Sequence, residues 1–128
     1  MKLKVKQHTY TFKPTSYTVS ETGHPGARKI MSVRRGTWVM DVAVRVGVAF
    51  NGTTPAISIG DGASATIFAL TADVACTATG LKHGYGAAFS GANGKLYTTT
   101  DTIDLAYTAA GDTTVGECTV IITYADLE

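Results

Sequence analysis

The chain has few of the residues on which the commoner kinds of metal and redox sites depend. Only two cysteines occur, Cys76 and Cys118, and they do not form a Cys-x-x-Cys pair. A zinc ribbon or a thioredoxin-type site is therefore not predicted. His8, His24 and His83 stand far apart, and none has a second ligand at metal spacing. We expect no metal or cofactor, and two buried free cysteines, with a disulfide between them as the alternative.

Long apolar runs and charged residues are scarce as well. No segment reaches the roughly 18 consecutive apolar residues that a membrane-spanning helix needs. The first residues alternate lysine with apolar residues, and no apolar run of signal-peptide length follows them. We expect no membrane association and no signal-dependent secretion. Charged residues make up 16% of the chain, against a usual share of about 25%, which indicates neutral surface available for contact with other subunits.

The sequence offers no convergent set of acid, base and nucleophile. Asp101 and Asp104 lie three positions apart in an expected strand, so they face opposite sides and do not form a glycosidase pair. The Gly-Asp-Gly at 60–62 lacks the further oxygen ligands of a calcium loop and is predicted to be a turn. A Gly-x-Ser-x-Gly elbow is absent. We therefore expect a protein that is not an enzyme.

The strongest pattern in the chain is a strict alternation between positions 38 and 50. Every even position there is large and apolar, namely Trp38, Met40, Val42, Val44, Val46, Val48 and Phe50. Side chains of a strand alternate between two faces, whereas a helix would scatter these residues around its circumference. The pattern predicts a long strand with its even face in the core. Trp38 belongs to this even face and is therefore expected in the core. A role in sugar stacking would require its ring to be exposed instead.

Other segments predict an all-β protein. Alternation recurs at 2–12, 56–59, 102–108 and 117–124, separated by glycine, asparagine, aspartate and proline turns. No segment of ten or more residues has a helical stripe. About eight short strands favour a β-sandwich, and a jelly roll in particular. An immunoglobulin-like sandwich is the alternative, although its Cys, Trp, Cys order is absent.

Charge divides the chain into two parts. Residues 1–35 carry eight basic residues and one acidic residue, whereas residues 36–128 carry three basic and nine acidic ones. We predict a basic N-terminal arm or set of outer strands (1–35) on a β-sandwich body (36–128). The arm's expected partner-binding residues are Lys2, Lys4, Lys6, Lys13, Arg28, Lys29, Arg34 and Arg35. They could lie against the body, a neighbouring copy or another acidic surface. Direct binding to nucleic acid is not expected, because the body is acidic and the arm has few aromatic residues.

The least periodic part of the body is the glycine-rich stretch 71–95. It predicts a long loop with one short strand, and loops carried by rigid β frameworks are frequent binding sites. Its candidate binding residues, for a sugar or a protein partner, are His83, Tyr85 and Phe89. An ordinary surface position is the alternative for His83.

Several runs of strand and turn residues resemble the small virion structural proteins of tailed bacteriophages. They are GTWVMDVAV at 36–44, FNGT at 50–53, ISIGDG at 57–62, LYTTTDTIDL at 96–105 and GECTVIITY at 116–124. The resemblance extends over about three-quarters of the chain. It implies a jelly-roll or related β-sandwich at the virion surface, often a trimer that decorates or cements a capsid.

The resemblance therefore implies a capsid decoration or cement protein that stabilises the phage head by bridging neighbouring capsid subunits. Its expected partners are the major capsid protein and further copies of itself in a homotrimer, on the head surface after assembly in the host cytoplasm. We expect deletion of residues 1–13 to leave the body folded but to weaken attachment to the shell. The alternative is a tail or fibre module that binds a host surface receptor or glycan through the 71–95 loop.

Overall fold

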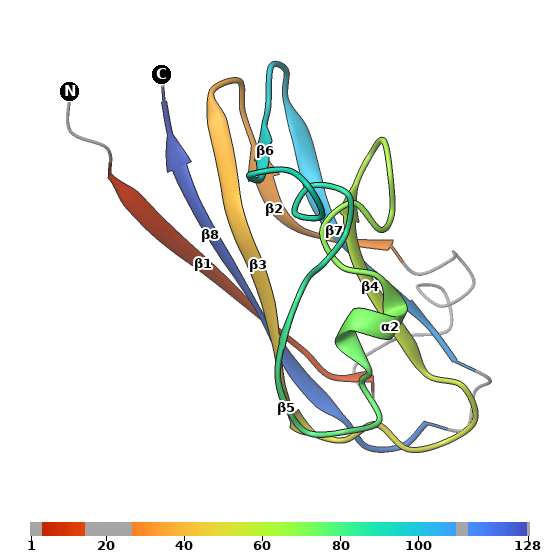
Figure 1. The fold of residues 1–128 in the computed structure, drawn as a ribbon. Coiled ribbons are helices and arrows are strands. Elements are labelled where there is room, and N and C mark those ends of the chain that lie inside the picture. The colour runs from red at the N-terminus through yellow and green to blue at the C-terminus, as the bar shows by residue number, and fades with distance from the viewer. Residues whose placement is uncertain (1–3, 15–26, 110–112, 128) are drawn as a thin grey trace.

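The computed structural model describes residues 4–14, 27–109 and 113–127. These residues form an all-β fold of two antiparallel sheets, with one four-residue helix (Figure 1). The predicted all-β class is confirmed. Within the described ranges, none of the helical structure is long and apolar enough to cross a membrane.

The larger sheet contains five strands, and β3 lies at its centre. In hydrogen-bonded order the strands are β1 (Val5–Phe12), β8 (Glu117–Asp126), β3 (Thr37–Val48) and β5 (Gly80–His83), with the short β6 (Lys95–Leu96) also paired to β3. β5 and β6 pair with opposite ends of β3. The chain between them therefore departs from the sheet beside the middle of β3, where it forms a loop over residues 84–94.

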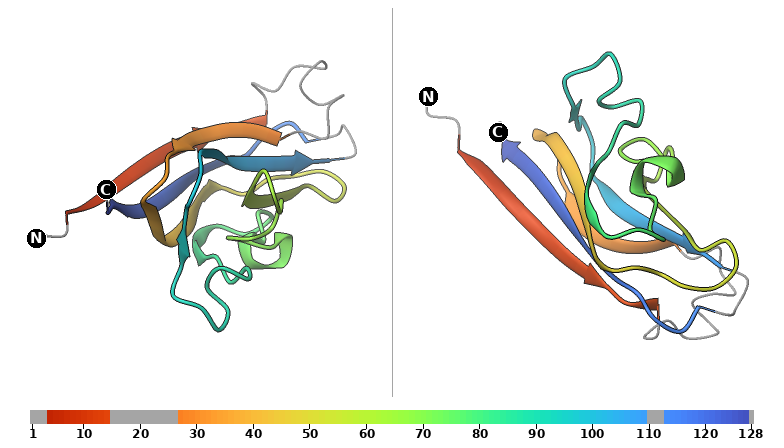
Figure 2. Two further views of the ribbon diagram at one scale, coloured as in Figure 1. Left: turned by 90° about the horizontal axis from the view of Figure 1, so that it is seen from above. Right: turned by 60° about the horizontal axis from the view of Figure 1, so that its bottom comes forward.

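The smaller sheet has three strands. Their order is β2 (Ala27–Val33), β7 (Asp101–Thr108) and β4 (Ala56–Asp61). Figure 2 shows the two sheets as separate layers. The helix α2 (Thr71–Val74) lies beside β4 and β5.

The core fills the space between the two sheets. Its fully buried residues alternate along each strand, as the period of two predicts, and include Val42, Val44, Val46, Ile57, Ile59, Ile103, Leu105, Val120 and Ile122. At one end Phe12, Phe50 and Tyr107 form an aromatic cluster with ring centroids 5.1 to 6.3 Å apart. Cys76 and Cys118 are both buried and free, as expected. Burial raises the pKa of the Cys118 thiol to about 12, so it behaves as an inert apolar group.

The two ends of β3 depart from the predicted alternation. Its register with β8 shifts between Val39 and Asp41 and again between Val46 and Val48. A β-bulge adds one residue to a strand and so exchanges the faces beyond it. Val39 is consequently buried, while Trp38 is only half-buried, and Val48 is 46% exposed. The expectation that Trp38 and Val48 lie in the core is therefore wrong.

The described parts of the basic N-terminal third are strands of the two sheets. β1 pairs with β8 over eight residues, and β2 forms an edge of the smaller sheet. Phe12 at the end of β1 is 1% exposed and belongs to the core. The structure argues against the expectation that residues 1–13 are dispensable for folding, because their removal would uncover β8 and take Phe12 from the core. The division at residue 35 stays a prediction.

Candidate binding surfaces

Basic residues of the N-terminal third meet an acidic residue of β8 at one end of the larger sheet. Lys6 Nζ lies 3.1 Å from Asp126 Oδ2, and Arg34 Nη2 lies 3.8 Å from the same oxygen. Thr37 Oγ1 donates to Asp126 Oδ1 at 3.2 Å. The hydrogen bond from Lys6 is the main reason why the pKa of Asp126 lies below its usual value. We call these four residues the Asp126 cluster.

Two further basic side chains of the N-terminal third have partners in their own chain. Lys13 Nζ is 3.6 Å from Glu117 Oε2, at the opposite end of the β1–β8 pair. Arg28 donates to the Tyr10 hydroxyl at 3.0 Å. Lys6, Lys13 and Arg34 thus contact acidic residues of their own chain, which was one of the three surfaces considered. Lys4, Lys29 and Arg35 are exposed, while Lys2 and His24 lie outside the described residues. Binding of a partner by this basic set stays a prediction.

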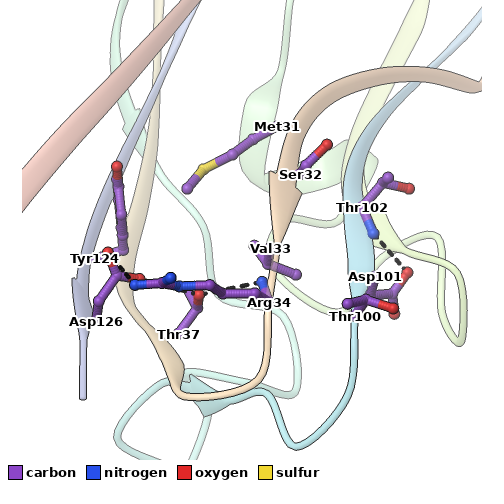
Figure 3. Close-up of a pocket in the computed structure, with 10 residues that line it drawn as sticks. All are labelled: Met31, Ser32, Val33, Arg34, Thr37, Thr100, Asp101, Thr102, Tyr124 and Asp126. Atoms are coloured by element: carbon purple, nitrogen blue, oxygen red, sulfur yellow. Dashed lines mark hydrogen bonds and ion pairs between the residues drawn. The ribbon is translucent and has the colours of Figure 1, made fainter. Parts of the chain in front are cut away.

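A groove of about 650 Å³ opens beside the Asp126 cluster, where the ends of the two sheets meet. Figure 3 shows Arg34 and Met31 extending from the β2 side toward Tyr124 and Asp126 of β8. Asp101, which pairs with Val33 on the neighbouring strand β7, also lines the groove, and its carboxylate accepts a hydrogen bond from the Thr102 amide. The Met31 side chain and the ion pair of Arg34 with Asp126 therefore line the same open hollow.

A second groove, here called the loop groove, has a volume of about 520 Å³ and lies between β3 and the 84–94 loop. It brings together all three loop residues selected from the sequence: His83, Tyr85 and Phe89. Trp38 and Asp41 of β3 also line it, and the sequence did not indicate them. Trp38 was assigned to the core, and only the bulge between Val39 and Asp41 turns it outward.

One hydrogen bond, one acid–imidazole pair and one ring contact involve the side chains of the loop groove. The Trp38 indole Nε1 donates to the Asn93 carbonyl at 3.0 Å. His83 Nδ1 lies 3.7 Å from Asp41 Oδ1, and about half of each side chain remains exposed. The Tyr85 ring is largely exposed, whereas Phe89 packs against the buried Phe68 with ring centroids 5.7 Å apart. The groove therefore combines aromatic surface with one carboxylate and one imidazole.

A buried acidic centre holds the smaller sheet to the start of β6. The Asp61 side chain is 0% exposed; it accepts hydrogen bonds from Lys95 Nζ, from the Tyr97 hydroxyl at 2.7 Å, and from the amides of Ala63 and Ser64 at 3.0 Å. Burial raises the pKa of Asp61, but these hydrogen bonds outweigh it, so the pKa lies below its usual value. The predicted turn at 60–62 is present, and its Asp61 also joins this turn to Lys95 and Tyr97.

The acidic pair weighed for glycoside chemistry has structural partners. Asp101 accepts hydrogen bonds from the Gly62 amide at 3.2 Å and the Thr102 amide at 2.7 Å, and so holds the 60–62 turn. Asp104 accepts from Thr102 Oγ1 at 2.8 Å. No three His, Cys, Asp or Glu side chains are grouped to hold a metal ion among the described residues.

This chain is similar to known proteins in structure but not in sequence. No family model matches the chain, and no curated protein matches it in sequence. The fold is similar to a chain in the acid-stable capsid of Helicobacter pylori bacteriophage KHP30, with a TM-score of 0.68 and 12% identity over 97% of this chain and 89% of that one.

Two further capsids contain similar chains. A chain of the Ralstonia phage GP4 capsid gives a TM-score of 0.64 at 8% identity, over 98% of this chain and 84% of that one. A chain of the cyanophage Pam1 capsid gives 0.58 at 21% identity, over 96% and 84%. The protein therefore has a fold found among phage capsid chains, which confirms the resemblance to β-rich virion proteins at the level of fold.

Proposed function

We propose that this protein is a structural component of a bacteriophage virion, and more precisely a decoration or cement protein that bridges neighbouring subunits of the head. The observation that carries the proposal is the extent of the structural matches. They cover 96–98% of this chain and 84–89% of three phage capsid chains. The similarity thus extends over nearly whole subunits of comparable length, as expected for a small accessory protein of the shell.

The order of strands supports the jelly-roll form of this proposal. The chain changes sheet at every step from β1 to β5, returns to the smaller sheet between β6 and β7, and crosses back to the larger sheet between β7 and β8. This alternation is typical of two Greek keys wound together, an architecture common in viral capsids. An isolated bridge from Ile59 to Ala69 occupies the free edge of β4, where a fourth strand of the smaller sheet would lie.

The outer face of the larger sheet is the surface best suited to contact other subunits. β1 and β8 present there an uncharged patch of paired residues, namely Gln7, Thr9, Thr11, Thr119, Ile121 and Thr123. Short neutral side chains on a sheet allow close approach without burying charge. We infer that this face packs in a homotrimer or on the major capsid protein, with the basic residues at its edge adding ion pairs of about 0.2–1 kcal/mol each. Repetition over a symmetric shell converts such weak contacts into avidity.

The proposal is tested by the number and position of copies in the virion. Quantitative mass spectrometry of purified virions is expected to give a copy number comparable to that of the major capsid protein. Cryo-electron microscopy is expected to place the chain across joints between shell subunits. A copy number matching that of a tail or fibre protein would reject the head assignment. It would favour instead the second candidate, a module that binds a host receptor, for which the loop groove is the supporting observation.

A further inference from the structure

We propose that the loop groove is a binding site for neutral carbohydrate chains, with Trp38 and Tyr85 as the stacking surfaces and Asp41 and His83 as the hydrogen-bonding groups. The inference rests on the residues of the groove and does not depend on whether the protein belongs to the head or the tail. Three features of the groove carry it: its aromatic surface, its polar groups and the rigidity of its backbone.

The aromatic residues present ring surface that the fold itself does not use. The Tyr85 side chain is 64% exposed, although the loop that carries it is held in place by backbone hydrogen bonds. Trp38 is half-buried, and its indole N–H is already bonded to Asn93, so it offers its ring rather than its donor. Pyranose rings have an apolar face of C–H groups, which packs on such amphipathic aromatic surfaces as water is displaced.

The polar groups of the groove suit hydroxyl ligands. Asp41 and His83 are 3.7 Å apart through one carboxylate oxygen, which leaves the second oxygen and the other ring nitrogen available to hydrogen-bond a ligand. A carboxylate can accept two hydrogen bonds, and an imidazole can donate or accept one at each nitrogen. Small-molecule sites commonly combine apolar surface with a few such groups. A carboxylate in the wall disfavours anionic sugars, which is why we assign neutral ones.

The loop is fixed before any ligand arrives. The amides of Gly84 and Gly86 donate to the carbonyls of Val42 and Phe68 at 2.9 and 3.1 Å, and the Tyr85 amide donates to Asp73 Oδ2 at 2.8 Å. A Cβ at Gly84 or Gly86 would lie only 2.1 or 2.3 Å from a carbonyl oxygen of the 67–68 segment. The backbone can therefore approach that segment only with glycine at these positions. A site held in this way loses little conformational entropy on binding.

Trp38 makes the test direct because it is the only tryptophan in the chain. Its fluorescence in the full-length protein is titrated with maltohexaose, cellohexaose, a chitin hexasaccharide, and polygalacturonate as the anionic probe. At least one neutral oligosaccharide is expected to shift the emission and protect Trp38 from acrylamide quenching. Isothermal titration calorimetry with that sugar then measures the variants. Tyr85→Ala and Asp41→Asn are each expected to weaken binding about tenfold or more.

Leu81→Ala is the matched control. Leu81 is exposed on β5, near the groove but not among its lining residues, so this variant should bind as the unmodified protein does. The proposal is overturned if none of the neutral sugars binds at millimolar concentration, or if Tyr85→Ala and Asp41→Asn bind as tightly as Leu81→Ala. Tighter binding of polygalacturonate than of every neutral sugar would overturn the assignment to neutral chains. Circular dichroism of each variant distinguishes lost binding from lost folding.

Discussion

Asp61 and Asp126 each bind a lysine and a hydroxyl group, but one is buried in the fold and the other lies at the surface. Asp61 has a side chain with no exposure, bonded to Lys95 and Tyr97. The Asp126 side chain is 21% exposed and lies at the rim of an open groove, with Lys6, Arg34 and Thr37. The hydrogen-bonding chemistry is similar, so the two sites differ mainly in their access to water.

Access to water decides what each aspartate can do. An ion removed from water must have all its hydrogen bonds replaced by protein groups, and loss of any one leaves a charge without solvation. Asp61 has this complete set and therefore fixes the 60–64 turn to the chain at Lys95 and Tyr97. Asp126 can exchange its partners for water, salt ions or residues of another subunit at little cost. We conclude that the Asp61 centre stabilises the fold, whereas a role of the Asp126 cluster in assembly stays a prediction.

The largest expected effect is that of Asp61→Asn. The amide has the same shape but no charge, and its NH₂ group meets the Lys95 ammonium, so we expect the free energy of unfolding to fall by about 3 kcal/mol. Urea denaturation followed by circular dichroism measures it. In a double-mutant cycle with Lys95→Met, the combined loss should be smaller than the sum of the single losses, because the two groups interact directly. A loss below about 1 kcal/mol would show that the buried pair is no stronger than an exposed one.

The role of Asp61 shows where reasoning from sequence stops. A Gly-Asp-Gly run predicts a turn from local backbone preferences, and the turn is present. The partners Lys95 and Tyr97 follow more than thirty positions later, and only the pairing of β6 with β3 and the crossing between sheets bring them near. No spacing in the sequence encodes that contact. The buried ion pair was therefore beyond prediction, although its turn was not.

Along β3 the sequence predicted the strand and its central face correctly, but not its ends. Val42, Val44 and Val46 are buried as the alternation requires. The bulges depend on how β3 is paired with β8, which is a property of two strands and not of one. For the same reason Tyr85 and Phe89 could be selected from the loop, whereas Trp38 on the other wall of the groove could not.

The pH dependence of stability should also separate the two aspartates. The pKa of Asp61 is lowered from its usual value of 3.8, so its ionised form stabilises the folded state above that pH. As the pH falls below 3.8, the unfolded chain binds a proton first and this contribution is lost. The difference in unfolding free energy between the unmodified protein and Asp61→Asn should therefore be constant from pH 7 to about pH 5. This difference in unfolding free energy should shrink progressively as the pH falls below 3.8.

Urea denaturation at a series of pH values from 7 to 2 measures this difference. Asp104→Asn is the control of opposite sign. Burial raises the pKa of Asp104, so its charge opposes folding at neutral pH, and the amide variant should gain stability there and lose that advantage in acid. A difference for Asp61→Asn that grows as the pH falls would contradict the assignment of Asp61 as a stabilising ionised group.

The smallest effect on stability is expected for Asp126→Asn, because its ion pairs are open to solvent whereas those of Asp61 are buried. Lys6 and Arg34 can turn to water when the carboxylate is lost, so the unfolding free energy should fall by only about 0.2–1 kcal/mol. Because the cluster is open to solvent, about 0.5 M salt should screen the ion pairs and reduce even this difference, while leaving the effect of Asp61→Asn largely unchanged. Urea denaturation of both variants at low and high salt measures the contrast. If the two aspartates showed equal losses and equal sensitivity to salt, burial would not be what distinguishes them, and the prediction that the Asp126 cluster serves assembly would lose its basis.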